Sequence, residues 1–493
     1  MWNRVTIWLF FGLSWQSWPA CGDTFTIRED NGNQAIIDAR LVGERQGLMA
    51  LERADGRIEI VPQQQILNRE VGPDPQPISC ETMIGRLTEE FGADTFRARA
   101  VPPYVVGLVL SEPITKNYES KVTACLNKGA AFMKTVEKVF LDFVGDLKLE
   151  TEKPRYPLVL LIFETDDDFM QFATKETGGQ GLSAGSMLGY YSSLTNRLVI
   201  RMSECHTFTT PLHEAIHQQV YNRGIIRRLS PVPVWFNEGI ATGFEGNGDK
   251  ISGGPLRVNR QYAQAVMNAK NVDWDDVVAN DKAFHGDVLA GEAYANAWSI
   301  HWFLVTKYRK QYVEFLQILG EKPPLQLDDT ETRIRDFERV FGKRIGKLQN
   351  EFPMWLDQAA KKQNISFVNQ TPVGYLKTQS NLAEVEMTAT KVGAGGDLEA
   401  EGQMRNLSYV RPMSFHITGE TDGGTYAEWY LPNVAPFKIM HLPKQLMHKQ
   451  MKGAPGGLRE STFRIKVRSV VPESETGKAW QRGQLPVPVW SDR

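Results

Sequence analysis

The sequence predicts an α+β protein in which a region of helices and buried strands lies between two modules made mainly of β-strands. Three observations lead to this prediction. Short strand-like runs separated by turn signals fill residues 24–70. Helical periodicities and one continuous apolar run follow over about 95–362. From residue 371 onward the pattern returns to short alternating runs among many glycines and prolines.

Length and composition are compatible with this three-part organisation. A chain of 493 residues is long enough for about three domains. Its 42% hydrophobic and 23% charged residues are typical of a soluble globular protein. A net charge of −2 gives no reason to expect nucleic acid or an anionic membrane as a partner. No run beyond the N-terminus reaches the length of a transmembrane helix.

The first module, residues 24–70, is predicted to be a small β structure. Turn signals at 31–32 (Asn-Gly) and 55–56 (Asp-Gly) separate its strand-like runs, which are 25–27, 35–42, 47–52 and 57–61. The closing pattern V-P-Q-Q-Q-I-L at 61–67 resembles the SLA-homology type of SH3-like β-barrel. That resemblance implies a barrel whose eukaryotic relatives bind short peptides, and a passive β module is the alternative. Residues 71–94 are predicted to be a linker because they open with V-G-P-D-P-Q-P.

The middle region, about 95–362, has the alternating helices and strands of a mixed domain. Apolar residues recur at helical spacing over about 117–145, and the run Y-P-L-V-L-L-I-F at 156–163 predicts a buried strand. Further strands are predicted at 104–110 and 198–202, and a short helix at 166–176. After Glu238 the chain is predicted to be mainly helical.

The last module, residues 371–493, is predicted to be a small β-sandwich. Its alternating runs are 398–404, 413–418, 427–431 and 463–470. The histidines His416, His441 and His448 lie there without the spacing of metal ligands. No chemistry is therefore expected in this module.

The motif His213-Glu214-Ala215-Ile216-His217 carries the main functional prediction. Residues i and i+4 share one face of a helix, so His213 and His217 can direct their imidazoles at one zinc ion. Glu214, beside the first histidine, can reach the open coordination position and accept a proton from water there. Thr210 is the expected N-cap of this helix, and Pro211 its first residue.

A third ligand is expected from the run W-F-N-E-G-I-A at 235–241. Glu238 lies on a second predicted helix, after an interval long enough for the first helix to end and the chain to turn. Phe236 and Ile240 recur at helical spacing and leave Glu238 on another side. Gly239 and Gly243 would allow this second helix to approach the first closely.

These two motifs resemble those of the gluzincin metallopeptidases, whose aminopeptidase branch carries a very similar W-x-N-E-G-x-A. Residues of about 95–360 also resemble a bacterial domain-of-unknown-function family grouped with these peptidases. The runs G-Y-Y-S-S-L-T-N-R-L-V-I at 189–200 and Y-A-N-A-W at 294–298 add to that resemblance. The interval to the third ligand is slightly longer than in the aminopeptidase branch. No segment matches that branch's motif for the substrate amine, so the resemblance does not extend to aminopeptidase activity.

The resemblance implies a zincin-like fold, Zn²⁺ on His213, His217 and Glu238, and Glu214 as general base. The expected function is therefore zinc-dependent hydrolysis of peptide bonds in a peptide or protein substrate. Two alternatives remain: a noncatalytic exported binding or surface protein on a metallopeptidase scaffold, and a zinc hydrolase of non-peptide amides. Retention of Glu214 argues against the first, because a structural zinc site needs no base.

Two further features are predicted to act on a substrate. Tyr294 lies in a region from which a tyrosine stabilises the oxyanion in related peptidases, with a core tyrosine as the alternative. Residues 188–202 are expected to hold an edge strand with which an extended substrate can pair, or else an ordinary hairpin.

Residues 1–22 have the features of a signal peptide. Arg4 supplies positive charge, the apolar run 7–15 is too short to span a bilayer, and 20–22 offers the small residues that signal peptidase needs. The protein is therefore expected to be exported, and hence secreted, periplasmic or at the cell surface.

Cysteine usage leaves two questions open. Ala20-Cys21 could instead be a lipoprotein junction with a lipid anchor on Cys21, but Trp18 stands where an aliphatic residue is normally required. After cleavage Cys80, Cys125 and Cys205 remain, which allows one disulfide and leaves one odd thiol.

The flanking modules are expected to be dispensable for the chemistry. All four zinc-site residues fall between 213 and 238, inside a region long enough to bury its own core. Proline-containing boundaries at 71–77 and 371–372 suggest that few contacts cross them.

Overall fold

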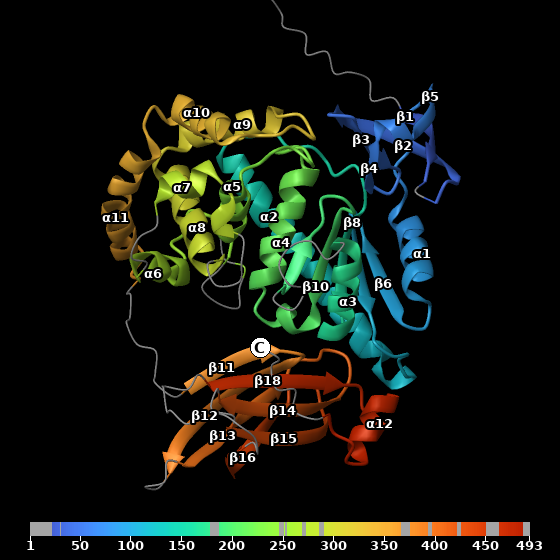
Figure 1. Ribbon diagram of the computed structural model, residues 1–493, viewed down its shortest axis with the longest axis vertical. Helices are drawn as coiled ribbons and strands as arrows, with labels where there is room; N and C mark the ends of the chain where they lie inside the picture. The colour runs from blue at the N-terminus through green and yellow to red at the C-terminus, as the bar shows by residue number, and fades with distance from the viewer. Residues whose placement is uncertain are drawn as a thin grey trace, which may run out of the picture. The chain divides into compact units, whose positions relative to one another are not determined.

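A computed structural model describes residues 22–29, 31–177, 187–245, 251, 254–268, 273–284, 290–365, 375–392, 397–421, 425–449 and 463–486 (Figure 1). The chain forms two compact units, Met1–Gln76 and Pro77–Arg493. The predicted signal peptide up to Cys21 lies outside the described residues. The architecture is mixed α/β, with β structure at the start, a central region rich in helices and β-sheets at the end, as the sequence predicts.

The first unit is one antiparallel sheet in the order β4-β3-β2-β1-β5. Its elements are β1 (Gly22–Arg28), β2 (Gln34–Arg45), β3 (Leu48–Arg53), β4 (Ile58–Pro62), the 3-10 turn η1 (Gln63–Gln65) and β5 (Ile66–Gly72). Alternate residues such as Phe25, Ile37 and Leu51 form its core. The predicted SH3-like barrel is not closed in the described residues, because β5 pairs with β1 and extends the sheet away from β4.

The stretch expected to be a linker, 71–94, contains a helix. The helix α1 (Cys80–Phe91) begins after Ser79, whose hydroxyl accepts a hydrogen bond from the Thr82 N–H at 3.1 Å. Met83 and Leu87 are buried and attach it to the central sheet. The linker was predicted from the prolines at 73–77, and composition alone does not reveal the amphipathic helix that follows them.

The central sheet has the order β6-β7-β8-β10-β9. Its strands are β6 (Phe96–Val101), β7 (Tyr104–Val109), β8 (Leu158–Phe163), β9 (Gly189–Tyr191) and β10 (Arg197–Arg201). The three inner strands are parallel, and the two edge strands pair antiparallel to their neighbours. Every residue of β7, β8 and β10 is buried, as expected of strands covered on both faces.

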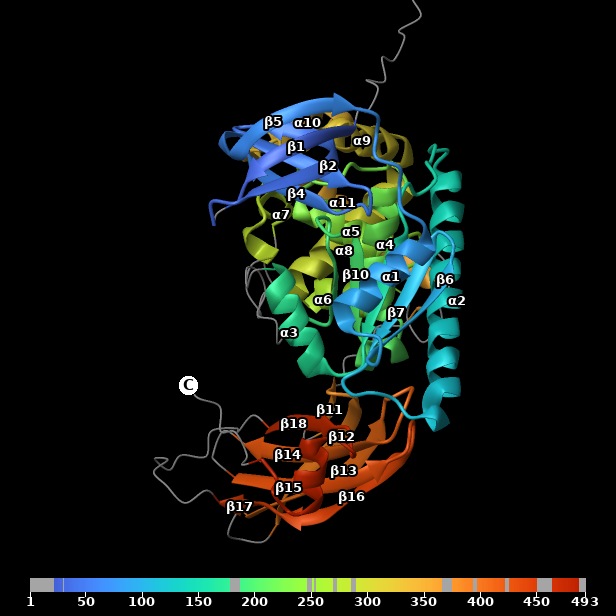
Figure 2. The ribbon, with the colours of Figure 1, turned by 90° about the vertical axis from the view of Figure 1, so that its right-hand side faces the viewer.

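Helices cover the two faces of this sheet, and Figure 2 shows α1 and the long α2 beside β6 and β7. Alternate strand residues such as Val105 and Leu161 pack with α1 and with α3 (Asp166–Thr177). Their neighbours, such as Val106 and Leu160, pack with α2 (Glu119–Asp146) and α4 (Thr209–Asn222). The helix α4 therefore lies against the sheet, immediately after β10 and the 3-10 helix η3 (Met202–His206).

The chain after α4 is mainly helical to Lys362, as predicted. The helices are α5 (Val234–Thr242), α6 (Arg260–Asn268), α7 (Trp274–Ala279), α8 (Ala290–Lys307), α9 (Arg309–Glu321), α10 (Thr330–Phe341) and α11 (Ile345–Lys362), with the short η4 (Lys282–Phe284) before α8. Aromatic side chains fill the spaces between them; Trp235 of α5, for example, stacks on Phe315 of α9 with ring centroids 6.0 Å apart. Among the described helices none has the length and apolarity to cross a bilayer.

The C-terminal part is two four-stranded sheets, in the orders β11-β12-β13-β16 and β17-β15-β14-β18. The strands are β11 (Tyr375–Ser380), β12 (Ala383–Val392), β13 (Asp397–Asn406), β14 (Met413–Thr421), β15 (Thr425–Val434), β16 (Ile439–Leu446), β17 (His448–Lys449) and β18 (Phe463–Val470), followed by α12 (Glu475–Gln481). Both sheets contribute buried residues, such as Val385 and Phe415, to one hydrophobic cluster with the central region. These sheets thus belong to the same compact unit as α4 and α5.

Candidate metal centre

The helix α4 brings the predicted histidines together. It runs from Thr209 to Asn222, and His213 and His217 lie one turn apart with both side chains buried. Thr210 is not its N-cap, contrary to the sequence prediction. The N-cap residue is Phe208, whose φ of 58° is left-handed and whose side chain makes no capping bond. The Thr210 hydroxyl instead donates to the Glu204 carboxylate at 3.1 Å.

The helix α5 presents Glu238 to these histidines. Its apolar side packs into the core through Trp235, Phe236 and Ile240, which leaves Glu238 on the side that faces α4. The sequence suggested that Gly239 allows α5 to approach α4 closely, but the structure places this glycine against α8 instead. A Cβ at Gly239 would lie 2.7 Å from the Ala297 carbonyl oxygen, so this glycine permits close packing of α5 on α8.

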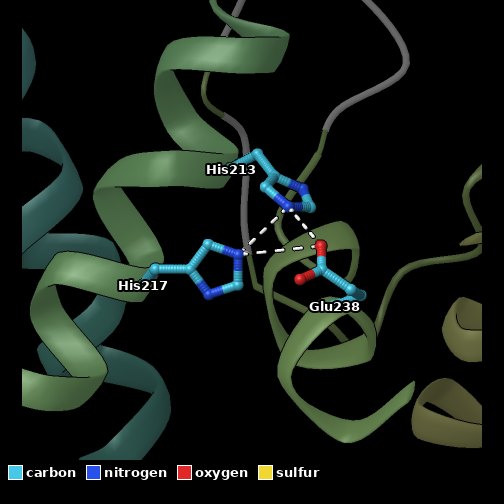
Figure 3. Close-up of side chains that lie close together, drawn as sticks. All are labelled: His213, His217 and Glu238. Carbon is cyan, nitrogen blue, oxygen red and sulfur yellow. Dashed lines mark hydrogen bonds and ion pairs between the residues drawn. The ribbon is translucent and has the colours of Figure 1, made fainter. Parts of the chain in front are cut away.

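Three donor atoms converge between the two helices (Figure 3). His213 Nε2 lies 2.9 Å from Glu238 Oε2 and 3.1 Å from His217 Nε2, and His217 Nε2 lies 3.8 Å from the same oxygen. Tetrahedral ligands bound to zinc at about 2.0–2.1 Å stand about 3.3 Å apart, close to these separations. Among the described residues no other group of three His, Cys, Asp or Glu side chains brings its ligand atoms within 4.8 Å of one another. Two imidazoles and one carboxylate fit a divalent metal ion.

The charge state of these groups also favours a cation. Burial alone would raise the pKa of Glu238, but His217 and His213 hold that pKa well below its usual range. Burial alone would lower the pKa of His213, whereas the Glu238 and Glu245 carboxylates raise it well above its usual range. A proton and a metal ion therefore compete for the same imidazole nitrogen, and metal binding is coupled to proton release.

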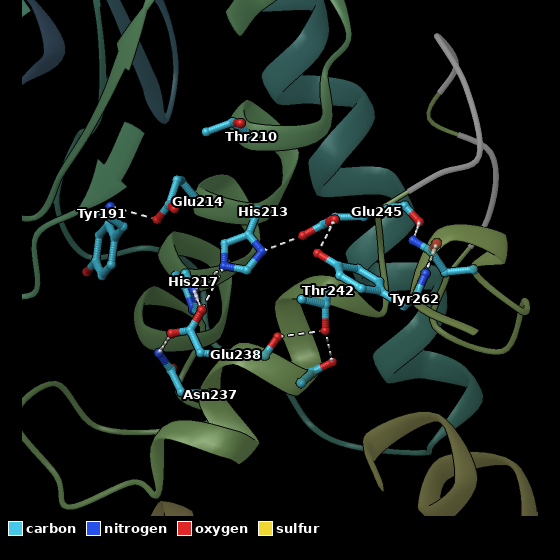
Figure 4. Close-up of polar contacts among 12 residues, drawn as sticks. Tyr191, Thr210, His213, Glu214, His217, Asn237, Glu238, Thr242, Glu245 and Tyr262 are labelled. Carbon is cyan, nitrogen blue, oxygen red and sulfur yellow. Dashed lines mark hydrogen bonds and ion pairs between the residues drawn. The ribbon is translucent and has the colours of Figure 1, made fainter. Parts of the chain in front are cut away.

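Glu214 lies next to the donor triangle, between Tyr191 and His213 (Figure 4). Its Oε2 accepts the backbone N–H of Tyr191, on the edge strand β9, at 2.9 Å. The side chain is partly accessible, yet the surrounding protein shields it enough to raise its pKa, while His213 and His217 oppose that rise. A carboxylate with a raised pKa beside an ion site is suited to accepting and returning a proton.

Glu245 is a site residue that the sequence analysis missed. Its Oε1 lies 2.7 Å from His213 Nδ1, and its Oε2 accepts the Tyr262 hydroxyl at 2.7 Å (Figure 4). A carboxylate on the far nitrogen of a histidine ligand orients the ring and raises its basicity. Glu245 follows the end of α5, so no helical spacing links it to the motif.

We expect Glu245→Gln to bind metal about tenfold to a hundredfold more weakly, because the neutral amide no longer supports the His213 ring. Metal analysis after dialysis against a graded chelator series would measure the loss. Glu331→Gln, which changes an exposed carboxylate on α10, is the matched control. Equal metal retention by both variants would exclude this role for Glu245.

Asn237 and Tyr221 fix the remaining oxygen of Glu238. The Asn237 amide donates to Glu238 Oε1 at 3.2 Å, and its own oxygen accepts the Tyr221 hydroxyl at 2.9 Å. The Thr242 hydroxyl donates to the Glu238 backbone carbonyl at 2.8 Å. The bond from Asn237 holds Oε1 of the carboxylate, with Oε2 toward the histidines.

The predicted Tyr294 lies beside this site, on α8. Its ring centroid is 6.0 Å from that of His213 and 5.9 Å from that of Phe284. Burial and then the Glu238 carboxylate raise its pKa far above the usual range, so the phenol is a neutral donor. His301 of the same helix is held elsewhere, with Nε2 2.8 Å from the Tyr312 hydroxyl and a pKa lowered by burial to about 3.

The three described cysteines form no disulfide, and the segment 188–202 forms a hairpin. Cys80, Cys125 and Cys205 are free thiols, and burial raises the pKa of each. The segment 188–202 forms the hairpin of β9 and β10, with β9 at the edge of the sheet. The segment is therefore a hairpin whose strand β9 ends the strand order of the described sheet, and its pairing with a substrate stays a prediction.

A buried glutamate before α4 predicts a pH-dependent stability. Burial raises the pKa of Glu204 to about 7 from its ordinary value of 4.5, with the Thr210 hydroxyl opposing the rise. The folded protein then binds this proton more tightly than the unfolded chain, so the free energy of unfolding falls as pH rises between these values. The expected loss is at most about 3 kcal/mol. Denaturant titrations of the wild type and Glu204→Gln across this range would measure it, and a pH-independent difference between them would contradict it.

Comparison with known proteins places one part of the chain in a family. Residues 207–326 match the family described as Protein of unknown function (DUF1570). The match is shorter than the region of about 95–360 expected from the sequence. It contains the three donor residues of Figure 3, and also Glu214, Glu245 and Tyr294. A search of curated proteins found no match. A DUF1570 domain is thus found at residues 207–326, and it contains His213, His217 and Glu238.

Proposed function

We propose that this protein is an exported, zinc-dependent metallopeptidase with a zincin-like central domain of the gluzincin type. The observation that carries the proposal is the convergence of His213 Nε2, His217 Nε2 and Glu238 Oε2, with the Glu214 carboxylate beside them. Two imidazoles and a carboxylate are a ligand set typical of catalytic zinc, which needs three protein ligands and one open position. The predicted signal peptide supports export.

His213, His217 and Glu238 would hold the ion. When bound, zinc supplies Lewis-acid chemistry, polarising a carbonyl and lowering the pKa of water. Glu245 and Asn237 would keep two of these ligands in place through the bonds described above. The protein thus contributes a rigid ligand set that needs little rearrangement on metal binding.

Glu214 would act as the general base. Its carboxylate would accept a proton from the attacking water and later deliver it to the leaving amine. The Tyr191 N–H holds one of its oxygens, which restricts the side chain without consuming the other oxygen. The neutral phenol of Tyr294 would donate a hydrogen bond to the oxyanion of the substrate.

An extended peptide would bind along β9. This strand is the edge of the central sheet, and its residue Tyr191 contacts Glu214 directly. A peptide that pairs with such an edge gains backbone hydrogen bonds that do not depend on its sequence. Its scissile bond would then lie close to the base. The proposed substrate class is therefore a peptide or an unfolded protein segment.

We expect the purified protein to contain about one zinc per chain and His213→Ala to lose it, because two donors bind far more weakly than three. Metal analysis would measure the content, with His441→Ala, an exposed histidine of β16, as the control. Equal zinc in wild type and His213→Ala would show that the site is misassigned.

Incubation with a denatured protein mixture, read by mass spectrometry, would test hydrolysis. New cleavage products that depend on zinc would support the peptidase. A zinc-loaded protein that cleaves nothing would favour the noncatalytic binding protein.

A further inference from the structure

The segment that leads into α4 is held by the C-terminal sheets. This segment is η3, Met202–His206, and two of its backbone carbonyls are acceptors for side chains far along the chain. Gln379 of β11 donates to the Ser203 carbonyl at 2.6 Å, and the Tyr409 hydroxyl donates to the Cys205 carbonyl at 3.0 Å. Both contacts cross the boundary at 371–372 that the sequence suggested would carry few.

The buried carboxylate of Asp166 also connects η3 with the C-terminal sheets. Asp166 accepts the Arg201 guanidinium at 3.1 Å, the Ser203 hydroxyl at 3.0 Å and the Asn381 backbone N–H at 2.8 Å. Arg201 ends β10, Ser203 lies in η3, and Asn381 follows β11. Because Asp166 is buried, these bonds are shielded from competition with water.

The start of α4 depends on η3. A side chain at the N-cap can accept a hydrogen bond from the first turn of a helix, but Phe208, the N-cap residue of α4, makes no such bond. Its first turn is attached instead through the bond from Thr210 to Glu204, and Glu204 belongs to η3. Phe208, between them, stacks on Phe132 of α2 at 5.6 Å. A shift of η3 therefore moves the first turn of α4.

Such a shift reaches the metal ligands directly. His213 and Glu214 lie one turn after Thr210, and helices transmit small displacements because their hydrogen-bonded backbone is stiff. Functional groups must be held within about 0.5 Å of their working positions. The ligand set is thus sensitive to the placement of η3.

We propose that Gln379 and Tyr409 are positioning residues, through which the C-terminal sheets hold η3 and the first turn of α4 where the ligand set requires them. The proposal rests on the proposed function for its effect on hydrolysis. Its effect on the order of the 202–212 segment stands independently of that function. It also implies that residues 371–493 support the chemistry, in contrast to the dispensability expected from the sequence.

The test uses the full chain with three changes: Tyr409→Phe, Gln379→Leu and the two together. Each removes one donor to η3 and keeps a side chain of similar size. Tyr430→Phe is the matched control, because it removes a buried phenol hydroxyl from the same sheets that has no hydrogen-bond partner among the described residues. Hydrogen exchange of the metal-free proteins would report on 202–212. Competition between the protein and a chelator for Zn²⁺, together with kcat and KM on a peptide, would report on the site.

In the double variant we expect exchange over 202–212 to become about tenfold faster, as the loss of two hydrogen bonds implies, with little change in the remote α9 and α10. Zinc retention should fall by a similar factor, and kcat should fall with little change in KM. Exchange equal to that of Tyr430→Phe, or an increase spread evenly over the whole chain, would overturn the proposal. If the wild type binds no zinc, the proposed function fails, and the exchange measurement still decides the role of Gln379 and Tyr409.

Discussion

Glu214→Gln is expected to lower kcat by about a hundredfold or more while leaving zinc content unchanged. The amide of glutamine cannot accept a proton from water, so the base is lost. Its oxygen can still accept the Tyr191 N–H that Glu214 now accepts at 2.9 Å. None of the three donor atoms belongs to this residue. The substitution therefore separates proton transfer from metal binding.

Steady-state kinetics, metal analysis and thermal unfolding of the same preparations would measure the three effects. Glu420→Gln, which changes a buried carboxyl of β14 in the C-terminal sheets, is the control for general loss of charge. Retained activity with an unchanged pH profile would rule out Glu214 as the base. Loss of zinc together with activity would assign Glu214 to the metal-binding groups instead.

The donors could be predicted because their geometry is local. Two histidines four residues apart meet on any α-helix, and Glu214 is covalently adjacent to one of them. Glu238 followed from a motif on the next helix. The structure brings all four together with Tyr294.

Glu245 could not be found in this way because its contact with His213 depends on where the chain goes after α5 ends. The partner of Gly239 is likewise set by helix packing. A glycine in the sequence indicates that another element can approach closely there. Which helix does so, α8 and not α4, depends on the tertiary fold.

In the fold, too, features set by local sequence could be predicted and features set by tertiary contacts could not. Strands and helices with strong periodicity, such as β8 and α2, were predicted close to their observed bounds. Elements with weak periodicity were missed, among them β6 with its two arginines and the polar β5. Whether β5 closes a barrel or extends a sheet depends on its partner strand, which is nonlocal information.

The proline at 372 suggested an independent C-terminal module, but the contacts that attach this module join residues far apart in the sequence. The buried ion pair between Arg411 and Glu164 is one of these contacts. Arg411 Nε lies 2.7 Å from Glu164 Oε1, and its Nη2 lies 3.0 Å from Oε2. No feature of either local sequence indicates the pairing.

Arg411→Ala is expected to lower the free energy of unfolding by about 3–5 kcal/mol, because it leaves an uncompensated carboxylate in the interior. The Glu164 side chain is fully buried, and Ser111 would be its remaining partner, through N–H and hydroxyl bonds of 3.1 and 3.3 Å. The guanidinium also donates to the Glu112 carbonyl at 2.7 Å, which would be lost as well.

The pH dependence of this loss separates the buried charge from lost packing. Burial raises the pKa of Glu164 even with Arg411 beside it, and removal of the arginine must raise it further. A group with a raised folded-state pKa favours folding less as pH increases, so Arg411→Ala should be most destabilised at neutral pH and less so in acid.

Denaturant titrations at several pH values would measure this pH dependence. The control is Arg405→Ala, whose side chain is 37% exposed and whose loss should cost about 1 kcal/mol or less. The double variant Arg411→Met with Glu164→Gln should recover much of the loss, since it removes both charges. A loss below about 1 kcal/mol that does not vary with pH would show that the pair contributes little to holding the C-terminal sheets against the central region.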